Sequence, residues 1–319
     1  MKPQDLQRMN RHPLTPSVTA LRSLAPATTL LLLAACGGGG GGTAPEPPAA
    51  QPSISANTVA LEGTTNIQPQ YGRRVVLSIT GSELGADKLS VTNTACTGLE
   101  RGSAAPYASS STTAYYLCTV NTVGAGRFEL RRSSDGQLLR SSEYTVPDPQ
   151  VRLVFNNDPT FFLQLTLDTR APVTVRNFLD YVNAGFYDQT VIHRLVPGFV
   201  AQGGGYASPV GAALPTLKPT RAPIALEIVP GLLNTTGTIS MARTNDPNSA
   251  TSQFFLNLGN NTMLDGGYAV FGRVTTGAGL LAAGGSIASA PCAAVAWLPA
   301  DGSCLPTPNL VITSATQQR

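Results

Sequence analysis

The pattern of apolar and polar positions divides the chain into four stretches. The first stretch, residues 1–35, has a basic start and then most of the apolar run LRSLAPATTLLLLAAC, which ends at Cys36. This run is too short to span a bilayer as a stable helix, and it has the form of a secretory signal peptide. Residues 36–52 are rich in glycine and then in proline, a composition that cannot bury a core and that predicts a tether.

Residues 53–146 carry short β-branched or aromatic runs between turn-rich segments, and they show no strong helical period. The runs are RRVVLSITG, KLSVTNTAC, AYYLCTV and RFELRRS. This spacing predicts a small β-sandwich of an immunoglobulin-like kind, although the Cys-Trp-Cys hallmark is missing because the single tryptophan is Trp297. No catalytic constellation is visible here, so we expect a spacer or a protein-contact module.

Residues 150–319 predict an antiparallel barrel or sandwich with at least one helix. VRLVF and FFLQLTL predict a hairpin, and later runs such as GTISMA, SQFFLNLG and YAVFGRV are strand-like. Between them, APVTVRNFLDYVNAGF starts with Pro172 and ends at Gly185, both of which are helix-boundary signals. Its apolar positions follow the i, i+3, i+4, i+7 spacing of an amphipathic helix: Val175, Phe178, Leu179 and Val182.

Charge is sparse and, outside the leader, balanced. The chain has 21 basic and 18 acidic residues, and the first 36 residues hold four of the basic and one of the acidic residues. The remainder therefore carries 17 of each sign. A neutral remainder gives no electrostatic reason to expect nucleic acid as a partner.

Leu33-Ala34-Ala35-Cys36 resembles the lipobox of bacterial lipoproteins. The resemblance implies cleavage before Cys36, lipid attachment to that cysteine, and a tether facing the periplasm from the outer membrane. An ordinary signal peptide with an incidental cysteine is the alternative, and Met9 is a second candidate start.

With Cys36 assigned to the lipid, four of the five cysteines remain. In an oxidising compartment the default expectation is two sequence-local disulfides, Cys96–Cys118 and Cys292–Cys304. No C-x-x-C spacing occurs and only one histidine follows the leader, so no metal site is expected.

Three long motifs occur in series: GFYDQTVIHRLVPGFVAQGGG, GTISMARTNDPNSATSQFFLNLG and LDGGYAVFGRV. Together they resemble the cyclophilin-type peptidyl-prolyl cis-trans isomerases, most closely the bacterial exported branch. The resemblance implies an eight-stranded antiparallel β-barrel capped by two helices, no cofactor, and proline-containing polypeptides as substrates. The expected chain is therefore all-β dominated, with a signal peptide (1–35), a tether (36–52), a β-sandwich (53–146) and an isomerase domain (150–319).

The resemblance also implies which residues act. Arg194 matches the family's catalytic arginine. The positions matching the substrate-binding groove and its apolar pocket are Phe199, Val200, Gln202, Ala242, Arg243, Gln253, Phe255, Met263, Leu264 and Tyr268. Val200 stands where methionine is usual, Met263 where cyclosporin-sensitive members have tryptophan, and Arg243 where the eukaryotic branch has asparagine.

An arginine suits the reaction because rotation about an X–Pro bond breaks no bond. The barrier arises from amide resonance, and a permanently charged donor aimed at the prolyl nitrogen stabilises the twisted state more than the planar state.

His193 is expected to face away from the groove, since successive strand residues point to opposite faces. The glycine run at 203–205 lacks the lysine and helix of a phosphate loop, so close packing of the backbone is the expected reason for it.

The functional prediction is a membrane-tethered prolyl isomerase for exported proteins. The alternative is a module that holds proline peptides with little turnover.

Overall fold

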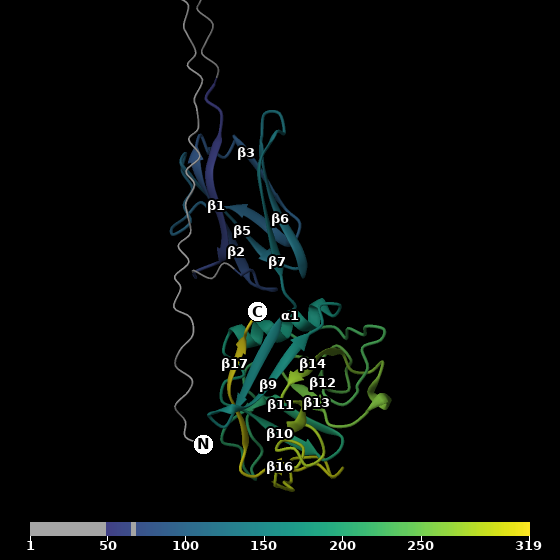
Figure 1. Ribbon diagram of the computed structural model, residues 1–319. Coiled ribbons are helices and arrows are strands. Elements are labelled where there is room, and N and C mark those ends of the chain that lie inside the picture. Colours follow the sequence, from purple (N-terminus) through teal and green to yellow (C-terminus); the bar gives the residue numbers. More distant parts are fainter. Residues whose placement is uncertain (1–48, 65–67) are drawn as a thin grey trace, which may run out of the picture. The chain divides into compact units, whose positions relative to one another are not determined.

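The computed structural model describes residues 49–64 and 68–319 (Figure 1). The predicted signal peptide, Cys36 and most of the tether lie outside these residues. Residues 49–319 group into one compact unit. In the part that is described, no helix has the length and apolar character needed to cross a membrane.

The first seven strands form two antiparallel sheets. One sheet has the order β1-β2-β5-β4, formed by Ser53–Leu61, Arg74–Ser82, Thr113–Val120 and Cys96–Arg101. The other has the order β3-β6-β7, formed by Leu89–Asn93, Gly124–Arg132 and Leu138–Val146. The four runs identified as strands are all strands, while the likeness to immunoglobulin domains and the division at residue 146 stay predictions.

Both expected disulfides are present among the described residues. Cys96 on β4 bonds Cys118 on the neighbouring strand β5, with Cα atoms 5.6 Å apart. Cys292 bonds Cys304, with Cα atoms 5.4 Å apart. Each bridge therefore closes a loop within its own half of the chain.

Eight strands in the second half of the chain close into an antiparallel barrel, which confirms the predicted fold class. Around the barrel the order is β10-β11-β13-β12-β14-β9-β8-β17. The strands are β8 Gln150–Phe155, β9 Asp158–Leu167, β10 Thr190–Val196, β11 Val200–Ala207, β12 Thr238–Met241, β13 Phe254–Asn257, β14 Val270–Thr276 and β17 Leu310–Gln317. Closure leaves no unpaired edge within the barrel sheet.

The predicted hairpin and helix both form. Asn156 and Asn157 join β8 to β9 with positive φ angles of 52° and 58°, the left-handed conformation that a tight hairpin turn needs. The helix α1 covers Pro172–Asn183 and buries all four of its predicted apolar positions. Its Phe178 ring packs against Phe254 of β13 and Phe271 of β14, so the helix closes one end of the barrel (Figure 1).

The second cap helix implied by the resemblance is absent from the described residues, which corrects that expectation. The remaining helical turns are two short 3₁₀ turns, Thr262–Leu264 (η1) and Ala278–Leu280 (η2). Around η2 the sequence TTGAGLLAAGGS contains four glycines, and each glycine costs about 1 kcal/mol in a helix interior. The chain continues through turns to two short strands, Cys292–Ala293 (β15) and Leu305–Pro306 (β16), which pair with each other.

Candidate functional site

Arg194 lies in one row of side chains that crosses three strands of the barrel. On β10 it is directly opposite Gln202 of β11, and Gln202 is in turn opposite Phe255 of β13. Residues paired across neighbouring strands place their side chains on the same face of a sheet. The barrel therefore presents a guanidinium, a carboxamide and an aromatic ring side by side.

Hydrogen bonds hold the polar part of this row. Arg194 Nη1 donates to Gln202 Oε1 over 3.4 Å, and Gln202 Nε2 donates to Gln253 Oε1 over 2.9 Å. A Cβ atom at Gly205 would lie only 2.7 Å from the Gln253 carboxamide. Glycine at this position is therefore required for Gln253 to reach Gln202, which agrees with the close-packing explanation of the glycine run.

An apolar cluster lies beside the row and is separate from the barrel core. Val200, Ala242 and Phe255 are its buried centre, with exposed fractions of 3%, 9% and 4%. The half-buried residues packed on this centre are Val196, Phe199, Leu264 and Tyr268. The structure thus brings together six of the seven apolar or aromatic substrate-binding residues predicted from the sequence: Phe199, Val200, Ala242, Phe255, Leu264 and Tyr268. The half-buried members of the cluster, Val196, Phe199, Leu264 and Tyr268, are partly exposed to solvent.

Two buried asparagines that sequence reasoning missed hold the turn that carries Phe199. Asn261 Nδ2 donates to the Phe199 carbonyl over 2.8 Å and to Asn257 Oδ1 over 2.7 Å. The backbone N–H of Leu258 also donates to the Phe199 carbonyl, over 2.8 Å. Buried polar groups need partners, and here their partnership positions a wall of the apolar cluster.

Arg243 and Met263 stand at the border of the cluster in different ways. The Arg243 guanidinium lies 4.5 Å from the centre of the Tyr268 ring, and its Nε donates to the Gly267 carbonyl over 2.8 Å. It therefore places a positive charge beside Tyr268, at the edge of the apolar cluster. The Met263 side chain was expected to line the groove, but it is 74% exposed and does not belong to the cluster.

His193 takes no part in the row. It is 4% exposed, and its ring meets Tyr206 edge-on with centroids 4.7 Å apart. Within the described part of the chain, its Nδ1 has no hydrogen-bond partner. Burial lowers its pKa to about 4, so the imidazole is neutral near pH 7. The expectation that His193 lies away from the groove agrees with these contacts.

Several known proteins are similar to this part of the chain. Residues 157–315 match the family described as cyclophilin type peptidyl-prolyl cis-trans isomerase/CLD. Peptidyl-prolyl cis-trans isomerase B of Escherichia coli is 45% identical over 35% of this chain and 70% of its own length. The Streptomyces antibioticus isomerase cyp18 is 48% identical over 34% of this chain and 68% of its own length. The chain belongs to the cyclophilin family.

Other relatives are covered less completely. Peptidyl-prolyl cis-trans isomerase A of Dickeya dadantii is 50% identical over 36% of this chain, which spans 61% of that relative's length. The corresponding share for the Acinetobacter baylyi isomerase is 58%, at 46% identity over 34% of this chain. A solved Cryptosporidium parvum cyclophilin aligns over 54% of this chain and 99% of its own, at 24% identity and a TM-score of 0.43.

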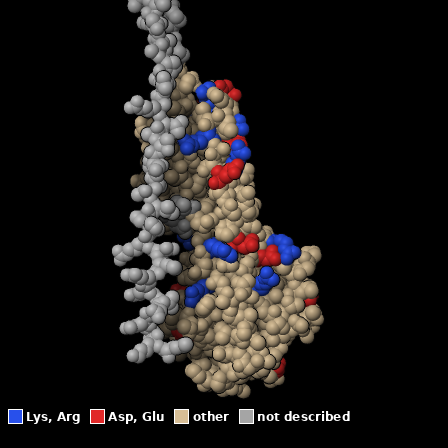
Figure 2. All heavy atoms as spheres, in the orientation of Figure 1, with Lys and Arg blue, Asp and Glu red and all other residues tan. Residues whose placement is uncertain are grey.

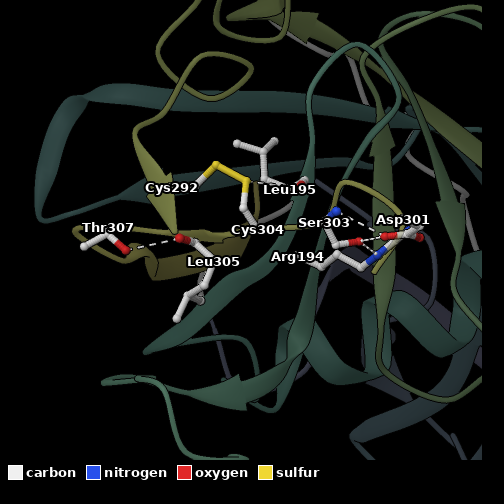
Figure 3. Close-up of a disulfide and its surroundings, with 8 residues drawn as sticks. All are labelled: Arg194, Leu195, Cys292, Asp301, Ser303, Cys304, Leu305 and Thr307. Carbon is white, nitrogen blue, oxygen red and sulfur yellow. Dashed lines mark hydrogen bonds and ion pairs between the residues drawn. A yellow bond between two sulfur atoms is a disulfide. The ribbon is translucent and has the colours of Figure 1, made fainter. Parts of the chain in front are cut away.

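The cyclophilin barrel also holds Arg194 through two residues that sequence reasoning did not identify. Arg194 Nε donates to Ser303 Oγ over 2.7 Å, and its Nη2 donates to Asp301 Oδ2 over 2.7 Å (Figure 3). Ser303 donates to Asp301 Oδ1 through both its hydroxyl and its backbone N–H. These hydrogen bonds from Ser303, together with those from Arg194, lower the pKa of Asp301 to about 2. Asp301 is therefore ionised at neutral pH.

The charged residues of this cyclophilin are few and of mixed sign on the face shown in Figure 2, where basic and acidic side chains alternate among uncharged surface. The described residues contain no group of three or more His, Cys, Asp or Glu that could hold a metal ion.

Proposed function

We propose that this chain accelerates the cis-trans isomerisation of X–Pro peptide bonds in exported polypeptides. The observation that carries the proposal is the row formed by Arg194, Gln202 and Phe255, with an accessible apolar cluster on its flank. The similar proteins of Streptomyces antibioticus and Escherichia coli are themselves called peptidyl-prolyl cis-trans isomerases, which supports the reaction class.

The proposed mechanism needs binding and one fixed donor. The apolar cluster around Phe255 receives the proline ring, and Gln202 and Gln253 hold the substrate backbone beside it. As the amide twists, its nitrogen becomes pyramidal and regains a lone pair, which accepts a hydrogen bond from Arg194. This interaction exists only in the twisted state, so it lowers the barrier without tightening ground-state binding.

Substitution of Arg194 tests the proposal. Arg194→Ala removes the donor and should lower kcat/KM for a proline peptide by about 100-fold or more, because preorganised donors contribute on that scale. Arg194→Lys retains charge but loses the planar fork, so its activity should remain well below that of the wild type. The measurement is the isomerisation rate of a short X–Pro peptide, followed by exchange NMR.

Arg131→Ala is the matched control, because Arg131 pairs with Glu129 on the same strand β6 in the first half of the chain. This variant should retain the wild-type rate. If the wild type only reaches the uncatalysed rate, or if Arg194→Ala is as fast as the wild type, the chain is not an enzyme of this kind. Peptide binding without acceleration would then favour the holding module.

We further propose that the chain is lipid-anchored through Cys36 and faces the periplasm, with the outer membrane as its expected location. The lipobox-like LAAC sequence and the Gly/Pro-rich segment after it support this proposal. Cys36→Ser should move the protein from the membrane fraction to the soluble fraction. Mass spectrometry of the mature amino terminus checks for acyl groups, and unchanged membrane retention of the variant would contradict the proposal.

A further inference from the structure

The loop between Cys292 and Cys304 lies on the flank of the proposed catalytic arginine. Its far end joins the barrel at β10, where Leu195 and Cys304 exchange two backbone hydrogen bonds of 2.8 and 2.9 Å. Leu195 is the residue after Arg194, so the backbone pairing brings the preceding part of the loop alongside the guanidinium. Figure 3 shows Ser303 and Asp301 pointing toward Arg194, while the disulfide lies on the opposite side of this segment.

The hydrogen bonds of Arg194 divide its donors into two groups. A guanidinium has five N–H bonds. Three are directed at Ser303, Asp301 and Gln202, one from each of its nitrogens. One N–H on each terminal nitrogen has no acceptor within the described ranges 49–64 and 68–319. These two are the donors that can reach a substrate, and their direction is set by the three that are held.

Asp301 and Ser303 form a closed unit with the arginine. Ser303 accepts from Arg194 Nε and donates to Asp301 Oδ1, while Asp301 Oδ2 accepts from Arg194 Nη2. Ser303 is 7% exposed, and the Arg194 side chain is 17% exposed. A planar guanidinium held through Nε and Nη2 cannot rotate about its last side-chain bonds without breaking both contacts.

The loop has a second attachment on its outer side. Trp297 donates from Nε1 to the Gly211 carbonyl over 3.1 Å and packs against Tyr206, with ring centroids 6.0 Å apart. Val295 and Leu298 belong to the same small apolar cluster, which has Leu305 at its buried centre. The apolar cluster around Trp297 and the disulfide thus attach the loop on both sides of Asp301.

We propose that Asp301 and Ser303 are positioning residues that aim Arg194 at the substrate, and that the Cys292–Cys304 disulfide keeps them in place. The proposal rests on the isomerase function proposed above. Arg194 remains the only member of this group that touches the twisted amide. Because Asp301 is 47% exposed, its ion pair contributes little to stability, and its loss should affect the rate and leave the melting temperature unchanged.

Substitutions in the full mature chain test the two side chains. Asp301→Ala should lower kcat about tenfold with little change in KM, because misdirected donors affect the twisted state and the apolar cluster still binds proline. Asp301→Asn keeps an acceptor of the same shape and should lose only about threefold. Ser303→Ala should resemble Asp301→Ala. Asp87→Asn removes an exposed carboxylate in the first half of the chain and is the control for the loss of charge.

A double-mutant cycle separates positioning from a general structural effect. In an Arg194→Ala background, Asp301→Ala should have no further effect on the rate, because its contribution acts through the arginine. A loss that is equal in both backgrounds would overturn the proposal. So would an unchanged rate of Asp301→Ala in the wild-type background, or an increased rate, which would mean that the carboxylate competes with the substrate.

The disulfide is tested by Cys292→Ala/Cys304→Ala, with Cys96→Ala/Cys118→Ala as the matched pair. The first double variant should lower kcat severalfold, and the second should stay within about twofold of the wild type. Equal rates of both pairs would show that the bridge does not hold the arginine. If Arg194→Ala itself had the wild-type rate, the isomerase proposal would fail first, so the two failures are distinguishable.

Discussion

At the scale of single residues, His193 shows why a histidine near an active site need not be catalytic. Its side chain is buried against Tyr206, and a protonated imidazole there would be a charge without a partner. Burial lowers its pKa from 6.5 to about 4, and the nearby backbone of Val191 offsets only part of that effect. Protonation of His193 should therefore lower the free energy of unfolding at acidic pH.

The direction of this pH effect follows from proton linkage. Between pH 6.5 and pH 4 the unfolded chain binds a proton at residue 193 and the folded chain does not, so the free energy of unfolding falls as the pH falls. From pH 7 to pH 5 the loss should be on the order of 2 kcal/mol. His193→Phe keeps an edge contact with Tyr206 and removes the titration, so it should lose correspondingly less over this range.

Denaturant unfolding at pH 7, 6 and 5 measures the effect in both proteins. The isomerisation rate of His193→Phe at pH 7 should stay close to that of the wild type, because the row of Arg194 does not include the histidine. If the two proteins lost equal stability between pH 7 and pH 5, the imidazole would not be the titrating group.

The same scale shows what the sequence could and could not predict about the site. Arg194, Gln202 and Phe255 were predicted because each lies within a long stretch resembling one family, and the structure pairs them in one row across three strands. Asp301 and Ser303 lie more than 100 residues away from Arg194 in a segment without a matching motif. The sequence predicted only the local disulfide Cys292–Cys304 in this segment, and a disulfide carries no information about which side chains face the arginine.

At the scale of elements, the periodicity of apolar positions predicted those helices and strands whose ends are marked by local residue signals. The hairpin β8–β9 and the helix α1 have clear periods and clear boundary residues, so both were predicted correctly. The bulge in β10 was not predicted: the pairing with β11 shifts register between Ile192 and Arg194, directly at His193. The prediction assumed that side chains alternate regularly along β10. His193 is buried away from Arg194 as expected, but it lies at a bulge where regular alternation is interrupted.

The second helix was predicted from the family resemblance and not from a pattern in this segment. The glycines around Ala278–Leu280 favour turns, and Gly277 and Gly284 adopt positive φ angles of 85° and 82°. Local propensity decides here because the segment has no amphipathic pattern to compensate for the cost of its glycines. A resemblance over long motifs thus predicts a barrel better than it predicts the connections between its strands.

At the scale of the whole molecule, the proposed isomerase site lies in one half of the chain. All eight strands of the closed barrel fall between Gln150 and Gln317, and the site residues fall between Arg194 and Ser303. A closed barrel needs no further strand to satisfy its backbone, so we expect the barrel half to fold by itself, although its apolar residues belong to one core with those of the first half.

A chain of residues 147–319 tests this division. It should unfold in one cooperative transition and isomerise a short proline peptide at a rate within about twofold of the longer chain, since all eight barrel strands and all residues of the proposed site are retained. Circular dichroism during thermal unfolding and the NMR exchange rate are the two measurements. A soluble, folded fragment with a rate lowered tenfold or more would mean that residues 53–146 help to form the site, and aggregation would mean that the barrel needs them to fold. With a full-length unfolded substrate, the fragment should be slower than the longer chain if the two β-sheets of the first half bind the polypeptide, and equally fast if these sheets act only as a spacer.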